Sequence, residues 1–122
     1  MKKYKLDLSK YNVTAQIFVT KEDGSRVLED KTEIYPLREN IRMWLRSIGV
    51  FKSGEDIAEA VSIAKQVRDC QKDLIELDER EVGILKQAVN RLIELTAEGN
   101  ANLGGEIHEE AIIRVVKMEE VK

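Results

Sequence analysis

The sequence predicts an α+β fold, in which an N-terminal antiparallel β-hairpin or meander packs against two to three helices. Apolar and polar residues alternate up to residue 35, the single proline stands at position 36, and helical apolar spacing follows over residues 36–97. At 122 residues the chain has the size of a single domain. It divides into a hairpin region (1–35), a helical region (36–97) and a loop with a C-terminal helix or strand (98–122).

Two strands joined by a tight turn are expected in the hairpin region. Aliphatic side chains stand at alternate positions over residues 13–19, and a shorter run around Leu6 has the same spacing. The Asp23-Gly24 step predicts the turn, because glycine tolerates positive φ. Residues 26–35 then return as the second strand.

Three helices are expected after Pro36. The first covers residues 37–48 and ends at Gly49, and the second runs from Ser53 to about residue 71. The third covers residues 78–97 and begins with a start that resembles a capping box, Asp78 followed by Glu81.

Three further segments complete the expected order of elements. Residues 74–77 form a short apolar segment that is either a strand or a tight connection, and residues 98–105 read as a loop. For residues 107–121 we expect a brief helical turn that passes into a strand, because residues 111–116 are rich in β-branched side chains. That strand is the candidate C-terminal addition to the sheet.

Few side chains in the chain suit catalysis. It has one histidine, His108, one cysteine, Cys70, and no glycine-rich phosphate loop. Acidic groups at residues 55–59 and 76–79 lack the spacing of a calcium loop. We therefore expect no enzyme, no metal, no cofactor and no small-molecule substrate. His108 reads as an exposed histidine beside Glu109 and Glu110, whose charges would raise its pKa.

The expected location is cytoplasmic. A lone cysteine cannot form an internal disulfide, which fits a reducing compartment. Residues 1–10 lack the apolar run of a signal peptide, and no stretch approaches the roughly 20 apolar residues of a membrane span.

Contact with another protein is the leading functional interpretation. A hairpin of two or three strands is marginally stable alone and leaves unpaired edges, which pairing with another subunit would cover. Residues 1–50 hold ten basic against seven acidic residues, whereas residues 51–122 hold ten against sixteen. This asymmetry fits either attraction between opposite ends of two copies or a helical half that carries more surface glutamate. We expect a non-enzymatic interaction or assembly protein that forms a homo-oligomer or binds another protein, with interface candidates Trp44, Phe18 and Tyr35.

A small nucleic-acid-binding regulator is the alternative. Arg38, Arg42 and Arg46 recur every four residues on the first expected helix, with Lys52 nearby. Such a row can follow phosphates. A solvated helix face or a protein interface explains the same spacing, and the acidic later helices would repel a phosphate backbone.

The layout also resembles a group of known proteins. The segments YKLDLSKY (4–11), YPLREN (35–40) and LDERE (77–81), together with the hairpin, resemble small proteins encoded by tailed phages and prophages. Those proteins are of largely unknown role, so the resemblance carries over no functional residue. It implies a phage or prophage accessory or virion-assembly protein, located in the host cytoplasm or the virion.

Overall fold

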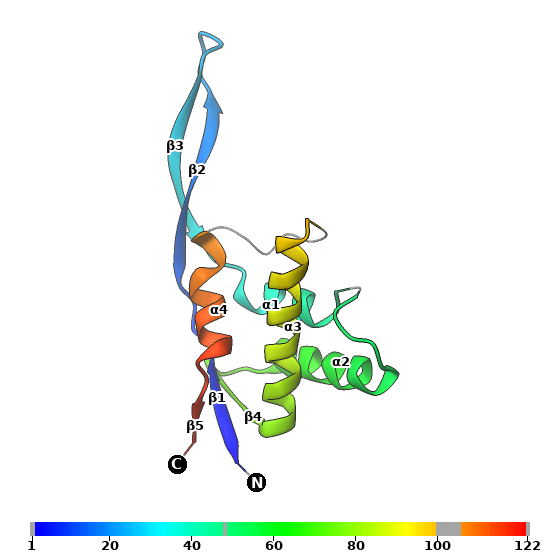
Figure 1. The fold of residues 1–122 in the computed structure, drawn as a ribbon. Helices are drawn as coiled ribbons and strands as arrows, with labels where there is room; N and C mark the ends of the chain where they lie inside the picture. The colour runs from blue at the N-terminus through cyan, green and yellow to red at the C-terminus, as the bar shows by residue number, and fades with distance from the viewer. Residues whose placement is uncertain (1, 48, 100–105, 122) are drawn as a thin grey trace.

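A long β-hairpin projects from a helical body in the computed structural model of the chain (Figure 1). The structure describes residues 2–47, 49–99 and 106–121. It confirms the α+β fold with its N-terminal hairpin, and it also contains a short C-terminal strand. The two antiparallel sheets are separate, one within the body and one in the hairpin.

The sheet of the body has the strand order β4-β1-β5. Its central strand, β1 (Lys3–Asp7), is antiparallel to β4 (Leu74–Asp78), with Leu6 opposite Ile75. On the other side β1 pairs with β5 (Glu119–Glu120). The segment that the sequence left open between strand and connection is therefore a strand.

The projecting hairpin, residues 12–34, is called the arm below. It consists of β2 (Asn12–Thr20) and β3 (Arg26–Ile34), paired in one unbroken antiparallel register. Gly24 has a φ of +85° in the turn between them, which explains the choice of glycine there. We expected the hairpin to lie against the helices. Instead nine residues per strand, at about 3.3 Å each, carry it away from the body.

Three helices form most of the body, and their starts follow local signals in the sequence. In α2 (Gly54–Asp69) the Ser53 hydroxyl accepts a hydrogen bond from the Asp56 N–H at 3.1 Å. In α3 (Glu79–Ala97) the Asp78 carboxylate and the Glu81 side chain cap each other's backbone N–H. Both predicted starts are confirmed.

The first helix is shorter than predicted. It is α1 (Leu37–Leu45), whereas the apolar spacing had suggested a helix to residue 48. The chain has left the helix by Arg46, and Gly49 has a φ of +85°, which favours glycine. Arg46 and Ser47 of the last predicted helical turn are therefore not helical, and residue 48 lies outside the described residues.

The C-terminal segment is more helical than its β-branched composition suggested. A 3-10 turn, η1 (Glu106–His108), leads into α4 (Glu109–Val116). Ala111 and Val115, four residues apart, are both fully buried, so helical spacing outweighed β propensity. Of the predicted loop over residues 98–105, positions 100–105 lie outside the described residues.

The hydrophobic core lies between the sheet of the body and the helices. Each of these elements contributes side chains with almost no exposed surface, among them Leu6, Leu77, Ile41, Ile63, Leu85 and Val115. The arm contributes Val13, which is partly buried against the edge of this core. The fold therefore derives its stability from the body, which supports the arm.

Candidate interaction site

An aromatic cluster holds the arm where it meets the body. The rings of Tyr11 and Tyr35 stack with their centroids 5.2 Å apart, and the Tyr35 hydroxyl lies 2.6 Å from Nδ1 of His108. The Trp44 ring meets the His108 ring edge to face, with the centroids 6.3 Å apart. The guanidinium of Arg114 lies 4.6 Å from the centroid of the Tyr11 ring. These five residues are called the base cluster.

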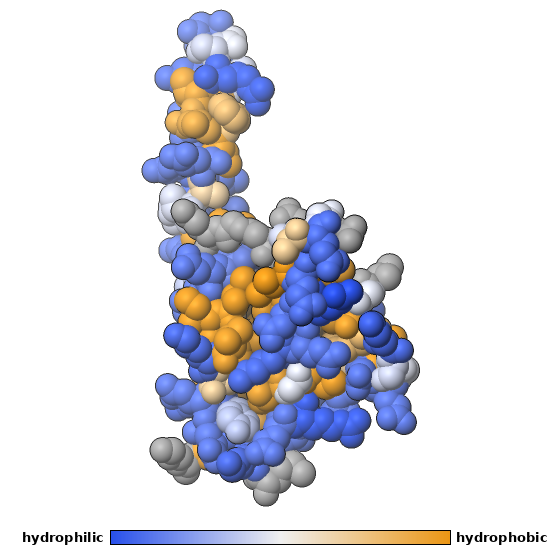
Figure 2. Space-filling model, viewed as in Figure 1, coloured by the Kyte–Doolittle hydropathy of each residue, from blue (hydrophilic) through white to orange (hydrophobic). Residues whose placement is uncertain are grey.

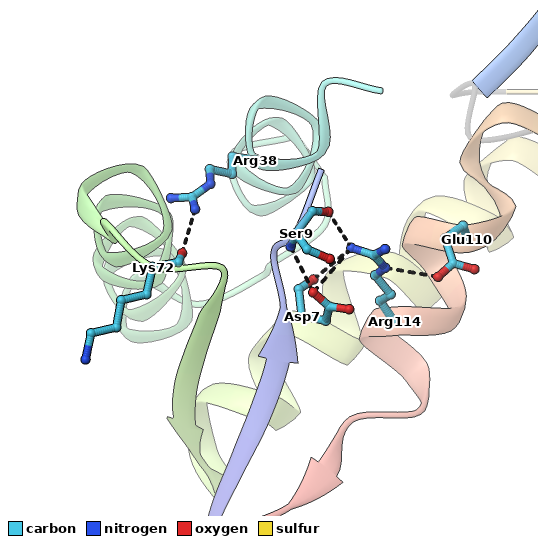
Figure 3. A network of polar contacts seen from close by, with 6 residues as sticks. All are labelled: Asp7, Ser9, Arg38, Lys72, Glu110 and Arg114. Atoms are coloured by element: carbon cyan, nitrogen blue, oxygen red, sulfur yellow. Dashed lines mark hydrogen bonds and ion pairs between the residues drawn. The ribbon is translucent and has the colours of Figure 1, made fainter. Parts of the chain in front are cut away.

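Arg114 joins α4 to the connection between β1 and β2 (Figure 3). Its Nη1 donates to the backbone carbonyls of Ser9, at 2.8 Å, and Asp7, at 3.3 Å. Its Nε donates to the Glu110 carboxylate at 3.0 Å, and only 12% of the side chain is exposed. A nearly buried guanidinium with several acceptors holds its surroundings in one geometry.

The surroundings of Arg114 also set two pKa values. Burial alone would raise the pKa of Asp7, but hydrogen bonds from Ser9 and the charge of Arg114 outweigh it and hold that pKa below its usual value. Burial and the neighbouring Tyr35 raise the pKa of Tyr11 to about 12. At neutral pH the site therefore contains a carboxylate and a neutral phenol facing one cation.

The three predicted interface residues do not lie together. Trp44 and Tyr35 each have 3% of their surface exposed and belong to the core, so a protein docking on the surface does not reach them. Phe18, by contrast, is 62% exposed and lies on the arm. Helical and strand spacing identify apolar positions, but they do not show which of them the body covers.

Apolar side chains gather near the far end of the arm, as the space-filling view shows (Figure 2). Cross-strand pairing places Phe18 opposite Leu28 on one face and Val19 opposite Val27 on the other, beside Ile17. Leu28 is 56% exposed, and Arg26 lies over the Phe18 ring at 5.0 Å. This tip cluster presents apolar surface on both faces of the ribbon, which a soluble monomer rarely does.

The predicted arginine row separates in the structure. The Arg38 guanidinium donates to the backbone carbonyls of Val67 and Cys70 and, at 2.7 Å, to that of Lys72, as seen in part in Figure 3. It therefore caps the C-terminal end of α2, where cations and donors are favourable. Its role is structural, so it is not a free contact for phosphates.

Arg42 and Arg46 instead share a hollow with two basic residues of α2. Together with Lys65 and Arg68 they line a depression of about 150 Å³, which is called the basic hollow. Asp69 is beside it: a hydrogen bond from Arg68, and the charges around it, lower the pKa of that carboxyl. The hollow therefore carries four cations and one nearby anion.

Sequence reasoning missed two residues of this hollow and added one that lies elsewhere. Lys65 and Arg68 lie three residues apart on α2, and only the contact between α1 and α2 brings them beside Arg42. The local spacing of α1 carries no signal of that contact. Lys52 lines a different depression, together with Asp56 and Glu94.

His108 is partly buried in the base cluster, although the sequence suggested an exposed residue. Burial lowers its pKa, and the expected rise from Glu109 and Glu110 is not found. Cys70 is also partly buried, with its thiol directed at the Lys72 carbonyl. Within the described ranges, no three side chains of His, Cys, Asp or Glu converge as a metal site requires.

Comparisons with known proteins identify no relative. The chain matches no family model, no curated protein and no solved structure. Among the helices of residues 2–47, 49–99 and 106–121, none has the length and apolar content needed to cross a bilayer. The arm and the basic hollow must therefore be interpreted from their own chemistry.

Arg38→Ala should lower the free energy of unfolding by about 2 kcal/mol, because three backbone carbonyls lose a charged donor. Arg46→Ala removes the same charge from an exposed position of the same region and should cost less than about 0.5 kcal/mol. Urea unfolding followed by Trp44 fluorescence measures both. Equal losses would contradict the capping role of Arg38.

Acidification should destabilise the fold through His108. Its pKa is lower in the folded protein than the ordinary 6.5, so the unfolded chain binds the proton more readily. The contribution of His108 to the free energy of unfolding is present above about pH 6.5. It is lost as the pH falls toward the pKa of His108 in the folded protein. His108→Gln should flatten the dependence between about pH 7.5 and 5.5, measured by urea unfolding. Since the chain has one histidine, parallel curves for both proteins would refute this assignment.

Proposed function

We propose that the protein is a non-enzymatic interaction protein that assembles through the arm and works as an oligomer. The observation that carries the proposal is the tip cluster, which exposes Phe18 and Leu28 on a hairpin projecting from the body. Exposed aromatic and aliphatic side chains of this kind anchor protein interfaces when a partner buries them.

The construction of the arm supports this proposal. A two-stranded hairpin is marginally stable in water, yet this one has nine residues per strand and a fixed base. The base cluster fixes the direction of the arm, so less freedom is lost when a partner docks. A phage or prophage accessory or virion-assembly role is the biological setting we propose, and the resemblance of the sequence is its support.

Replacing Phe18 and Leu28 by serine should weaken self-association about ten-fold or more, because the largest exposed side chains of the tip cluster are lost. Light scattering after size-exclusion chromatography measures the mass over a concentration series at low and high salt. The wild type should remain an oligomer at high salt, since apolar contacts are not screened.

The control replaces Met43 and Ile57, two apolar residues of the body that are 57% and 49% exposed, by serine. This variant should associate like the wild type. A wild type that is monomeric at every concentration, or an oligomer that the Phe18 and Leu28 variant does not weaken, would refute the proposal.

Nucleic-acid binding is a second candidate function, and the basic hollow is the observation that favours it. Arg42 of α1, Arg46 just after it, and Lys65 and Arg68 of α2 line one depression. Several cations around one hollow attract a phosphate group. The net charge of −3 opposes binding of a long backbone, so we rank this function below assembly.

If the hollow binds nucleic acid, affinity should fall steeply as salt rises, and Arg42→Ala with Arg46→Ala should reduce the slope by about one for each lost phosphate contact. Arg80→Ala with Arg91→Ala removes two arginines of α3 outside the hollow and should leave the slope unchanged. Fluorescence anisotropy with labelled single- and double-stranded DNA and RNA measures this. The absence of binding at low salt would exclude this function.

A further inference from the structure

The two outer edges of the arm differ in charge. The sequence of β2, NVTAQIFVT, contains no charged residue, no glycine and no proline. The sequence of β3, RVLEDKTEI, has five charged residues among its nine. Edge strands of soluble proteins are usually protected by charges or proline, because an unprotected edge pairs with other strands. By this criterion β3 is protected and β2 is not.

The backbone of β2 has hydrogen-bonding groups that point away from β3. In the continuous register of the arm, the N–H of Tyr35 bonds to the carbonyl of Tyr11, and the N–H of Lys21 bonds to that of Ser25. Hydrogen-bonded and non-hydrogen-bonded residue pairs alternate in an antiparallel ladder. The backbone N–H and C=O groups of the odd-numbered residues of β2 therefore point toward β3. The even-numbered residues from Asn12 to Thr20 point their N–H and C=O groups outward, and within the described residues no other strand pairs with them.

We propose that β2 pairs with β2 of a second copy, antiparallel and across a twofold axis at Gln16, to form a four-stranded sheet. The order of strands is then β3-β2-β2-β3, with both charged edges outside. This inference rests on the proposed function, since it names the partner and the contact that the arm uses. Backbone hydrogen bonds supply the affinity, as in other cases of strand addition.

The side chains of β2 are complementary to themselves in this register. Full overlap of the nine residues places Val13 opposite Val19 of the second copy, and Ala15 opposite Ile17. All four lie on one face, so apolar pairs run across the junction. Because β2 carries no charge, no ion faces a like ion, whereas full overlap of two β3 strands would place Asp30 opposite Asp30 of the second copy.

The charged edges also limit the size of the assembly. After two copies have joined, each remaining edge is a β3 strand that carries three acidic and two basic residues. A third arm would meet these charges, and it would have to desolvate them in order to pair. The contact is therefore isologous and closes at the dimer.

A cysteine at Gln16 tests the contact directly, in a chain that also carries Cys70→Ser. Across the proposed axis the two Cα atoms at position 16 lie about 5.5 Å apart, within the range of a disulfide. Mild oxidation of Gln16→Cys should therefore give a covalent dimer. Asp30→Cys is the matched control, because Asp30 lies opposite Gln16 on the same face of the arm. In the proposed dimer the two residues at position 30 are separated by three strand spacings, about 14 Å, and the cysteines should not cross-link.

A charge at the same position gives a second measurement. Gln16→Lys places two ammonium groups opposite each other and should raise the dimer dissociation constant several-fold, whereas Asp30→Lys at the outer edge should not. Light scattering measures the mass, and circular dichroism confirms that both variants are folded.

The outcomes separate this inference from the proposed function. If the Phe18 and Leu28 variant dissociates but position 16 neither cross-links nor responds to lysine, the arm assembles by another contact and the β2 pairing is wrong. If the wild type is monomeric throughout, both proposals are wrong. A dimer that cross-links at position 16 and not at position 30, and that the Phe18 and Leu28 variant weakens, supports both. A cross-linked dimer that this variant does not weaken supports the β2 pairing and refutes assembly through the tip cluster.

Discussion

The guanidinium group of Arg114 lies where the body sheet, the last helix and the arm meet. It bonds to the carbonyls of Asp7, at the end of β1, and Ser9, and to Glu110 of α4. It also covers the ring of Tyr11, just before the arm. A nearly buried cation must have all these acceptors in place, because an unpaired one would carry a large desolvation cost. The direction in which the arm leaves the body follows from that requirement.

Aromatic and aliphatic residues have different roles in this molecule. At the base of the arm, the rings of four residues pack against one another: Tyr11, Tyr35, Trp44 and His108. Their defined packing geometry fixes the angle between the arm and the body. The aliphatic side chains near the tip, together with Phe18, make few specific contacts within the chain and remain exposed. The molecule thus combines a firmly held base with a tip whose apolar side chains remain exposed. The proposed assembly depends on this difference.

Local signals in the sequence predicted much of the fold. The features that depend on contacts between distant parts of the chain could not be predicted in this way. The Asp23-Gly24 turn, the Ser53 cap and the Asp78–Glu81 capping box each involve residues within four positions, so the sequence displays them. The burial of Trp44, the capping of α2 by Arg38 and the approach of Lys65 to Arg42 depend on how α1 meets α2 and α3. Spacing along one helix gives its apolar face but not the neighbour that covers it. Of the three interface candidates, only Phe18 therefore lies at an exposed position.

The order of synthesis along the chain places the uncharged β2 strand outside the ribosome before the residues that hold the arm. Residues 12–20 leave the ribosome before β3, and the hairpin can close within microseconds once residue 34 is free. Arg114 follows about 80 residues later, which at roughly 5–20 residues per second is several seconds. During that interval the arm exists without its support, next to other nascent chains on the same messenger RNA. The proposed pairing of β2 strands would then begin between neighbouring ribosomes before the body has folded.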